Sequence, residues 1–137
     1  MSNIVDLLAV VSCLQSDELL CELINAASPQ AIVMPFAKDH AKSYLFVAVF
    51  FSDDNLRKEE VFKACKRIVA LLRRKHLATL DGVEILVSVV TGVKTERVLR
   101  LSILKDSLDV FENMDKLELN IRAPAAGITT LMYRQIS

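Results

Sequence analysis

The chain has 137 residues, with 17 basic and 17 acidic side chains, and 53% of its residues are hydrophobic. A chain of this length can bury roughly two thirds of the surface that its unfolded form exposes, without support from disulfides or metals. Its formal charge of zero provides no overall field that would attract nucleic acid or an anionic membrane surface. We therefore expect a single domain over residues 1–137, somewhat richer in apolar residues than an ordinary soluble domain.

The three cysteines, Cys13, Cys21 and Cys65, have no CxxC spacing, and an odd number does not fit a disulfide framework. They are typical of buried thiols in a reducing compartment. No basic segment precedes the first apolar run, and the longest apolar run, 44–51, is far shorter than the roughly 20 residues of a membrane-spanning helix. We expect a cytoplasmic protein without membrane contact.

Apolar residues recur at helical spacing between Asn3 and Ala27, which predicts an N-terminal helical segment. Asn3 and the run Ser16-Asp17-Glu18 are both typical signals for the start of a helix. The pattern fits one long helix, or two short helices joined near Gln15. Ser28-Pro29 ends the segment in either case.

Two strands and a long helix are predicted next. Residues 31–36 form a short strand candidate, which Pro35 restricts to an edge or a loop because proline cannot donate to a strand ladder. Residues 43–51 give the strongest strand signal in the chain, because this run is apolar on both of its faces. An amphipathic helix is expected over 56–75, capped by Asp53 or Asp54, with charges that match its dipole.

The second half of the chain predicts a hairpin, a short helix and two further strands. The turn Thr91-Gly92-Val93-Lys94 joins strand 83–90 to strand 95–104. Simple alternation along the return strand places Arg97 beside Leu99 and Val98 on the opposite face. The remaining expected elements are a helix at 106–114, a strand with one wet face at 117–122 and a final edge strand at 128–136.

From residue 43 to residue 122 the predicted order is strand, helix, strand, strand, helix, strand. This order predicts a ferredoxin-like βαββαβ core, in which both helices cover one face of a four-stranded antiparallel sheet. The expected fold class is α+β, with a helical segment over 1–29 and terminal strands added to the 43–122 core. The rival arrangement is a mixed α+β layer with the N-terminal helix packed alone on one side.

The strand at 43–51 raises the main functional question, because only one of its two apolar faces can receive the crossover helices. Tyr44, Phe46 and Phe50 share the other face, which Leu86 continues. Covering even two phenylalanines is worth several kcal/mol at roughly 25 cal/mol per Å² of apolar surface. Either the segment 3–27 lies across this face, or a second copy or another protein covers it. In the latter case the apolar first helix, with Leu8 and Val11, would also contribute to the interface.

No motif in the sequence supports a specific chemistry. The three glycines are isolated, which excludes the glycine-rich loops that bind phosphate groups. His40 and His76 have no further ligand at metal-binding spacing. The cysteines fall on apolar helix stripes, where a thiol is usually inert. We therefore expect no catalytic, cofactor or metal site.

The strongest charge feature is the segment Arg57 to Lys75, where eight basic residues against two acidic ones give a local charge of +6. Such a stripe can neutralise the phosphates of a nucleic acid. The ordinary alternative is a solvated face that acidic residues elsewhere in the fold balance. The candidate nucleic-acid contacts are Lys63, Lys66, Arg67, Arg73 and Arg74.

These patterns support three functional hypotheses. The first is a non-enzymatic protein-interaction or regulatory module that binds itself, as a homodimer, or another protein. The alternative is association with nucleic acid through the basic helix at 56–76. The third is a small-ligand sensor or an enzyme whose pocket is assembled from scattered residues such as His40 or Tyr133.

Overall fold

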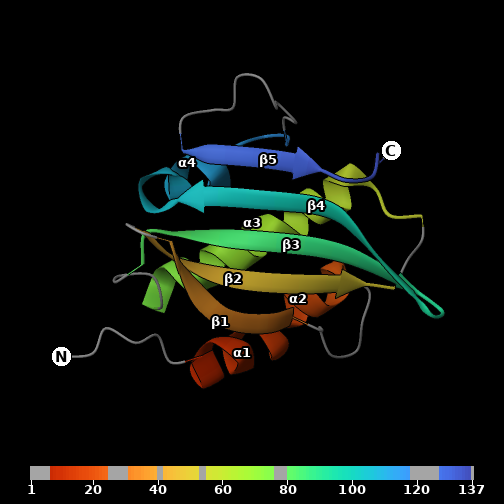
Figure 1. Ribbon diagram of the computed structural model, residues 1–137, viewed down its shortest axis with the longest axis horizontal. Coiled ribbons are helices and arrows are strands. Elements are labelled where there is room, and N and C mark those ends of the chain that lie inside the picture. Colours follow the sequence, from red (N-terminus) through yellow and green to blue (C-terminus); the bar gives the residue numbers. More distant parts are fainter. Residues whose placement is uncertain are drawn as a thin grey trace.

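The computed structural model describes residues 7–24, 31–39, 42–52, 55–75, 80–117 and 127–136, and for 7, 31–39, 42, 43 and 75 it describes the backbone only. Helices and strands follow the chain in the order that Figure 1 shows. Their bounds are α1 Leu7–Gln15, α2 Glu18–Leu23, β1 Ala31–Asp39, β2 Lys42–Phe51, α3 Lys58–Lys75, β3 Gly82–Thr91, β4 Lys94–Leu104, the 3₁₀ turn η1 Lys105–Ser107, α4 Leu108–Glu112 and β5 Ile128–Met132.

Five strands form one mixed sheet in the spatial order β1-β2-β3-β4-β5. The pairs β1–β2, β3–β4 and β4–β5 are antiparallel, whereas β2 and β3 are parallel. Parallel neighbours require a crossover connection, and α3 provides it. The combination of helices with this sheet confirms the α+β class.

The ferredoxin-like arrangement is not the one observed. It requires an antiparallel sheet, but the first two strands of the predicted core, β2 and β3, are direct parallel neighbours. Most of the predicted strand at 117–122 lies outside the described residues, and β5 is the strand that pairs with the far side of β4. The sequence pattern predicted most elements and the β3–β4 hairpin correctly, but it did not predict that β2 and β3 are direct neighbours.

The core lies between one face of the sheet and α3. Alternate residues of β2 and β3 on this face pair in register, and all of them are buried. The stripe predicted for α3 is buried against them, and burial raises the pKa of the Cys65 thiol to about 12, which leaves it protonated at neutral pH. The main residues of the core are Leu45, Val47, Val49, Phe51, Val61, Phe62, Cys65, Ile68, Val69, Leu72, Val83, Ile85, Val87 and Val89.

The N-terminal segment contains two helices rather than one, and Asp17 begins the second. The Asp17 carboxylate accepts a hydrogen bond from the backbone N–H of Leu20 (2.9 Å) and two from the Arg67 guanidinium of α3 (2.9 and 2.7 Å). The pKa of Asp17 is lowered, mainly by the hydrogen bond from Arg67. One carboxylate therefore caps α2 and fastens it to α3.

The two N-terminal helices pack on the same side of the sheet as α3, so of the two alternatives for the second face of β2, a covering N-terminal helix is not the arrangement observed. The shorter helix, α2, contacts α3, while α1 lies beside β1 and also contacts α3 (Figure 1). Their inward residues complete the main core rather than a separate one. These residues are Val10, Leu14, Leu20 and Ile24.

Two register shifts modify the strands. The first lies between Met34 and Ala37 and includes Pro35, which fits the prediction of an edge strand that proline interrupts. The second lies in β4, where Leu99 pairs with Val87 but Arg97 pairs with Ser88. The extra residue, Val98, is buried in the core, and Arg97 is exposed. The simple alternation predicted for β4 is therefore wrong before Leu99, because a bulge exchanges the faces of the residues that precede it.

Replacing Asp17 tests the two roles of its carboxylate separately. Asp17→Asn keeps a good capping side chain and loses the charge, so we expect a loss of about 0.5–1 kcal/mol in the free energy of unfolding. Asp17→Ala loses the cap as well, which adds about 1 kcal/mol. Urea unfolding monitored by circular dichroism measures both losses.

The same series has a pH dependence with a defined sign. Because the pKa of Asp17 is lower in the folded chain, its charge stabilises the fold above the unfolded pKa of about 3.9. That stabilisation disappears as the pH falls through the folded pKa. The difference between the original chain and Asp17→Asn should therefore shrink at acidic pH, and a difference that grows there would contradict this role.

Candidate functional site

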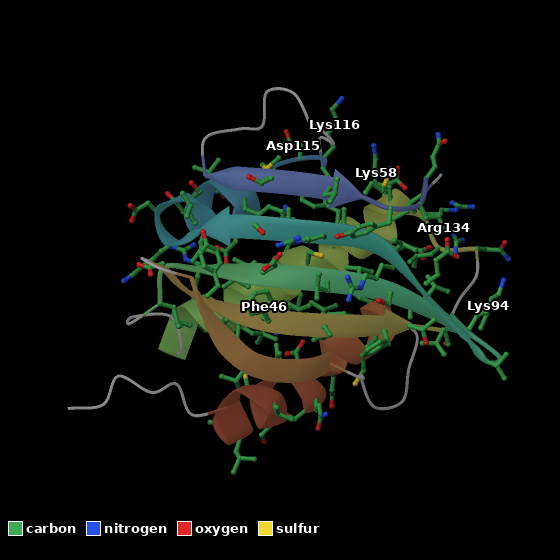
Figure 2. All side chains as sticks on the ribbon, in the orientation of Figure 1. Phe46, Lys58, Lys94, Asp115, Lys116 and Arg134 are labelled. Atoms are coloured by element: carbon green, nitrogen blue, oxygen red, sulfur yellow. The ribbon has the colours of Figure 1, made fainter. Side chains whose placement is uncertain are left out.

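The helices leave the other side of the sheet uncovered within the part of the chain that the structure describes. Figure 1 views this side directly, with α2, α3 and α4 behind the strands, and Figure 2 shows Phe46 upon it. We call it the open face. It consists of Tyr44, Phe46, Ala48 and Phe50 of β2, Gly82, Glu84, Leu86, Ser88 and Val90 of β3, Arg97, Arg100, Ser102 and Leu104 of β4, and Thr129, Leu131 and Tyr133 at β5.

An apolar row runs along β2 on the open face. Its three aromatic side chains, Tyr44, Phe46 and Phe50, are half-buried, in contrast to the fully buried residues that alternate with them. The Tyr44 ring lies against Gly82, where an added Cβ would collide with both the ring and the Ile103 carbonyl oxygen. Glycine at this position therefore lets an aromatic ring lie flat on the sheet.

Apolar side chains continue toward β5. Leu86 is half-buried, and Leu131 and Tyr133 are 38% and 45% exposed. Leu86 lies beside Ala48 and extends the row on β2, whereas Leu131 and Tyr133 form a second apolar zone at the β5 side of the open face. Three of the four sheet residues predicted to form an interface, Tyr44, Phe46 and Phe50, are thus on one strand, with Leu86 on its neighbour.

A charged pair occupies the centre of the open face between the two apolar zones. Arg100 donates to Glu84, whose side chain is only 5% exposed, whereas that of Arg100 is 48% exposed. The pKa of Arg100 is raised, mainly by Glu84 and to a smaller extent by Tyr133 near the end of β5. The pKa of Tyr44 is raised by partial burial and then by the carboxylates of Asp81 and Glu84. The face therefore has a polar centre with apolar flanks.

The predicted interface residues of the first helix belong to a different surface. Leu8 is 84% exposed and Val11 is half-buried, both on α1 at the β1 edge of the molecule. The structure brings the four sheet residues together and leaves these two apart from them. The sequence predicted all six as one interface because it could not place α1.

Three of the five candidate nucleic-acid contacts have partners within the fold. Lys66 donates to the Met114 carbonyl oxygen (2.8 Å) and lies over the Phe62 ring, 5.0 Å from its centroid. Arg67 holds Asp17, and Arg73 binds Glu112 of α4 (2.5 Å). The basic residues of α3 thus attach three separate segments to it. Lys63 and Arg74 are exposed, and neither has an ion pair with another residue in the described ranges.

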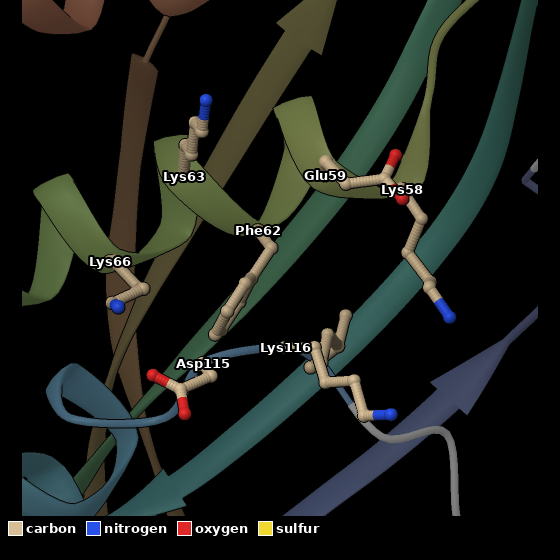
Figure 3. Close-up of a pocket in the computed structure, with 8 residues that line it drawn as sticks. Lys58, Glu59, Phe62, Lys63, Lys66, Asp115 and Lys116 are labelled. Atoms are coloured by element: carbon tan, nitrogen blue, oxygen red, sulfur yellow. The ribbon is translucent and has the colours of Figure 1, made fainter.

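A cavity of about 270 Å³ lies between the first half of α3 and the segment that follows α4 (Figure 3). Phe62 and Leu117 provide its apolar wall, and both are buried. No local sequence pattern predicts this cavity, because its two walls are about fifty residues apart in the chain. Its charged lining comprises Lys58, Glu59, Lys63, Lys66, Asp115 and Lys116.

Other sites have little support from the described part of the chain. His40 and His76 lie outside it, as do the predicted caps Asp53 and Asp54. Across 7–24, 31–39, 42–52, 55–75, 80–117 and 127–136, no three His, Cys, Asp or Glu residues are grouped so that they could hold a metal ion. None of the helices in these ranges has the length and apolar character needed to cross a membrane.

Comparison of the chain with protein-family models, with curated proteins and with solved structures found no match. The features that indicate a function are therefore the open face, the basic helix α3 and the cavity beside it.

Removing Arg100 tests whether the central pair is needed for the fold. Arg100→Gln leaves the buried Glu84 carboxylate without its cation, so we expect a loss of about 1–3 kcal/mol in the free energy of unfolding. The double variant Glu84→Gln, Arg100→Gln leaves no unpaired charge and should lose less. Chemical denaturation measures the free energy of unfolding of both variants. Equal losses in the single and the double variant would show that the unpaired Glu84 charge does not destabilise Arg100→Gln.

Proposed function

We propose that this protein is a non-enzymatic interaction module that closes the open face of its sheet against a second copy of itself. The observation that carries the proposal is that the helices in the described part of the chain, α1 to α4, pack on one side, while a row of three aromatic side chains stays half-buried on the other. Exposed apolar patches of this kind, bordered by polar groups, commonly mark protein-protein contacts.

The size of the face suits a dimer. Five strands spaced by about 4.8 Å, of which β5 is the shortest with 5 residues and β4 the longest with 11, give a surface of about 24 by 27 Å. Two such faces would bury about 1,300 Å² in total, at the lower end of the range of about 1,200–2,000 Å² for stable interfaces. Stacked sheets also pack well against each other, because both faces are regular.

The charge distribution also favours a second copy as the partner. The whole chain has a formal charge of zero, so two copies do not repel one another through their net charge. The centre of the face carries both signs, in Glu84 and Arg100, and a two-fold axis would bring opposite charges within reach across the interface. Burial of the half-exposed Arg100 there would also strengthen its bond to Glu84.

Association with nucleic acid has less support than the dimer. It depends on the exposed Lys63 and Arg74, since the other candidate cations hold Asp17, Glu112 and the Met114 carbonyl group. The third candidate function, a small-ligand sensor or an enzyme, has no specific observation in its favour beyond the cavity beside α3.

Light scattering behind a size-exclusion column tests the dimer. We expect a dimer mass for the original chain and a monomer mass for Phe46→Glu, because a carboxylate in the middle of a dry interface would have no partner. Leu131→Glu, at a more exposed position, weakens the dimer with little risk to the fold. Far-UV circular dichroism identifies any variant that has lost its structure.

The matched control is Val93→Glu, which introduces the same charge at the fully exposed tip of the β3–β4 hairpin. It should remain a dimer. A monomer mass for the original chain at every concentration would refute the proposal. So would dimers of folded Phe46→Glu and Leu131→Glu that dissociate no more readily than the control.

A further inference from the structure

The cavity beside α3 is on the helix side of the sheet, away from the open face. Phe62 projects from α3 toward the segment 115–117, and Figure 3 shows it between Lys66 and Lys116. The Phe62 ring packs edge-on against Phe111 of α4, with the ring centroids 5.6 Å apart. Phe62 and Leu117 are almost fully buried, so the apolar wall of the cavity is continuous with the core.

The lining of the cavity is positive. Among the described residues that line it, four lysines and two carboxylates give a formal charge of +2. Lys66 is fixed by its bond to the Met114 carbonyl oxygen, which satisfies one of its donors without neutralising its charge. Figure 3 shows Lys58 and Lys63 extending away from the Phe62 ring at the rim. Their long stems can turn toward a bound anion, since each has several rotatable bonds.

The lysines at this cavity differ from the arginines farther along α3. Arg67 and Arg73 each pair with a carboxylate of another helix. Lys58, Lys63 and Lys116 have no ion pair with any residue in the ranges that the structure describes. Three lysines without an ion pair to a described residue thus lie together where the cavity opens.

From this combination we propose that the cavity binds a small phosphate monoester that carries an apolar group. The apolar group would pack on Phe62 and Leu117, and the phosphate would lie among Lys63, Lys66 and Lys116. An apolar cavity of about 150 Å³ holds a benzene molecule, so one of about 270 Å³ has room for a ring together with a phosphate. This proposal does not depend on the dimer, because the two surfaces lie on opposite sides of the sheet.

Titration of the full chain with phenyl phosphate, followed by calorimetry and by amide chemical shifts, tests the proposal. We expect saturable binding, with the shifts concentrated in α3 and residues 114–117. Phenol, which lacks the phosphate, and inorganic phosphate, which lacks the ring, should each bind more weakly. The double variant Lys63→Gln, Lys116→Gln should weaken phenyl phosphate binding by about tenfold or more, since each lost lysine removes a charge-assisted hydrogen bond.

The matched control is Arg74→Gln, Lys94→Gln, which removes two positive charges from exposed positions outside both the cavity and the open face, one near the end of α3 and one in the β3–β4 hairpin (Figure 2 labels Lys94). Its affinity should change little. Three results would each overturn the proposal: no saturable binding at millimolar phenyl phosphate, phenol binding as tightly as phenyl phosphate, or an equal loss of affinity in the two double variants. The replaced lysines are exposed, and thermal unfolding verifies that the fold is intact.

Discussion

The parallel pairing of β2 with β3 is the constraint on which the rest of this structure depends. Two adjacent parallel strands cannot be joined by a tight turn, so the chain must leave the sheet and return across one of its faces. The connecting helix, α3, has a wide apolar stripe and therefore packs on the face that it crosses. The other described helices, α1, α2 and α4, also bury their apolar residues on that side. The second face of β2 remains open although its sequence is almost equally apolar.

The basic residues of α3 hold other segments on the same side of the sheet. Arg67 fastens the N-terminal helices, Arg73 fastens α4, and Lys66 holds the backbone just after α4. The basic residues of α3 therefore have a structural role, because three of them bind other segments of the chain to this helix. Ion pairs of this partly exposed kind contribute little energy individually, so their main effect is to fix where the segments lie. Lys58, Lys63 and Lys116, which have no ion pair with a described residue, line the cavity instead.

Local patterns predicted much of this fold, and tertiary pairing explains what they did not predict. The strand at 43–51, the interruption at Pro35, the start signal at Asp17 and the turn at Gly92 all depend on neighbours a few residues away. Which strands pair depends on contacts between distant segments, and so the antiparallel core was expected wrongly. The bulge at Val98 could not be predicted either, because the alternation of side chains in the sequence does not show where one strand has an extra residue.

The candidate interface was predictable in its sheet residues and not in its helical ones. A strand that is apolar on both faces indicates that two layers must cover it, which identified Tyr44, Phe46 and Phe50. The location of α1 depends on the side that α3 occupies, and no local pattern encodes that choice. The cavity had no local signal at all, since Phe62 and its neighbouring lysines look like any amphipathic helix.

The two tyrosines of the chain, Tyr44 and Tyr133, both lie on the open face, and the chain has no tryptophan. Intrinsic fluorescence therefore reports on this face alone. The most direct measurement is quenching of that emission by acrylamide over a range of protein concentrations. If the open face closes against a second copy, the quencher should reach the tyrosines in dilute solution and lose access as concentration rises. Quenching of the tyrosines that stays the same at every protein concentration would contradict closure of the open face against a second copy.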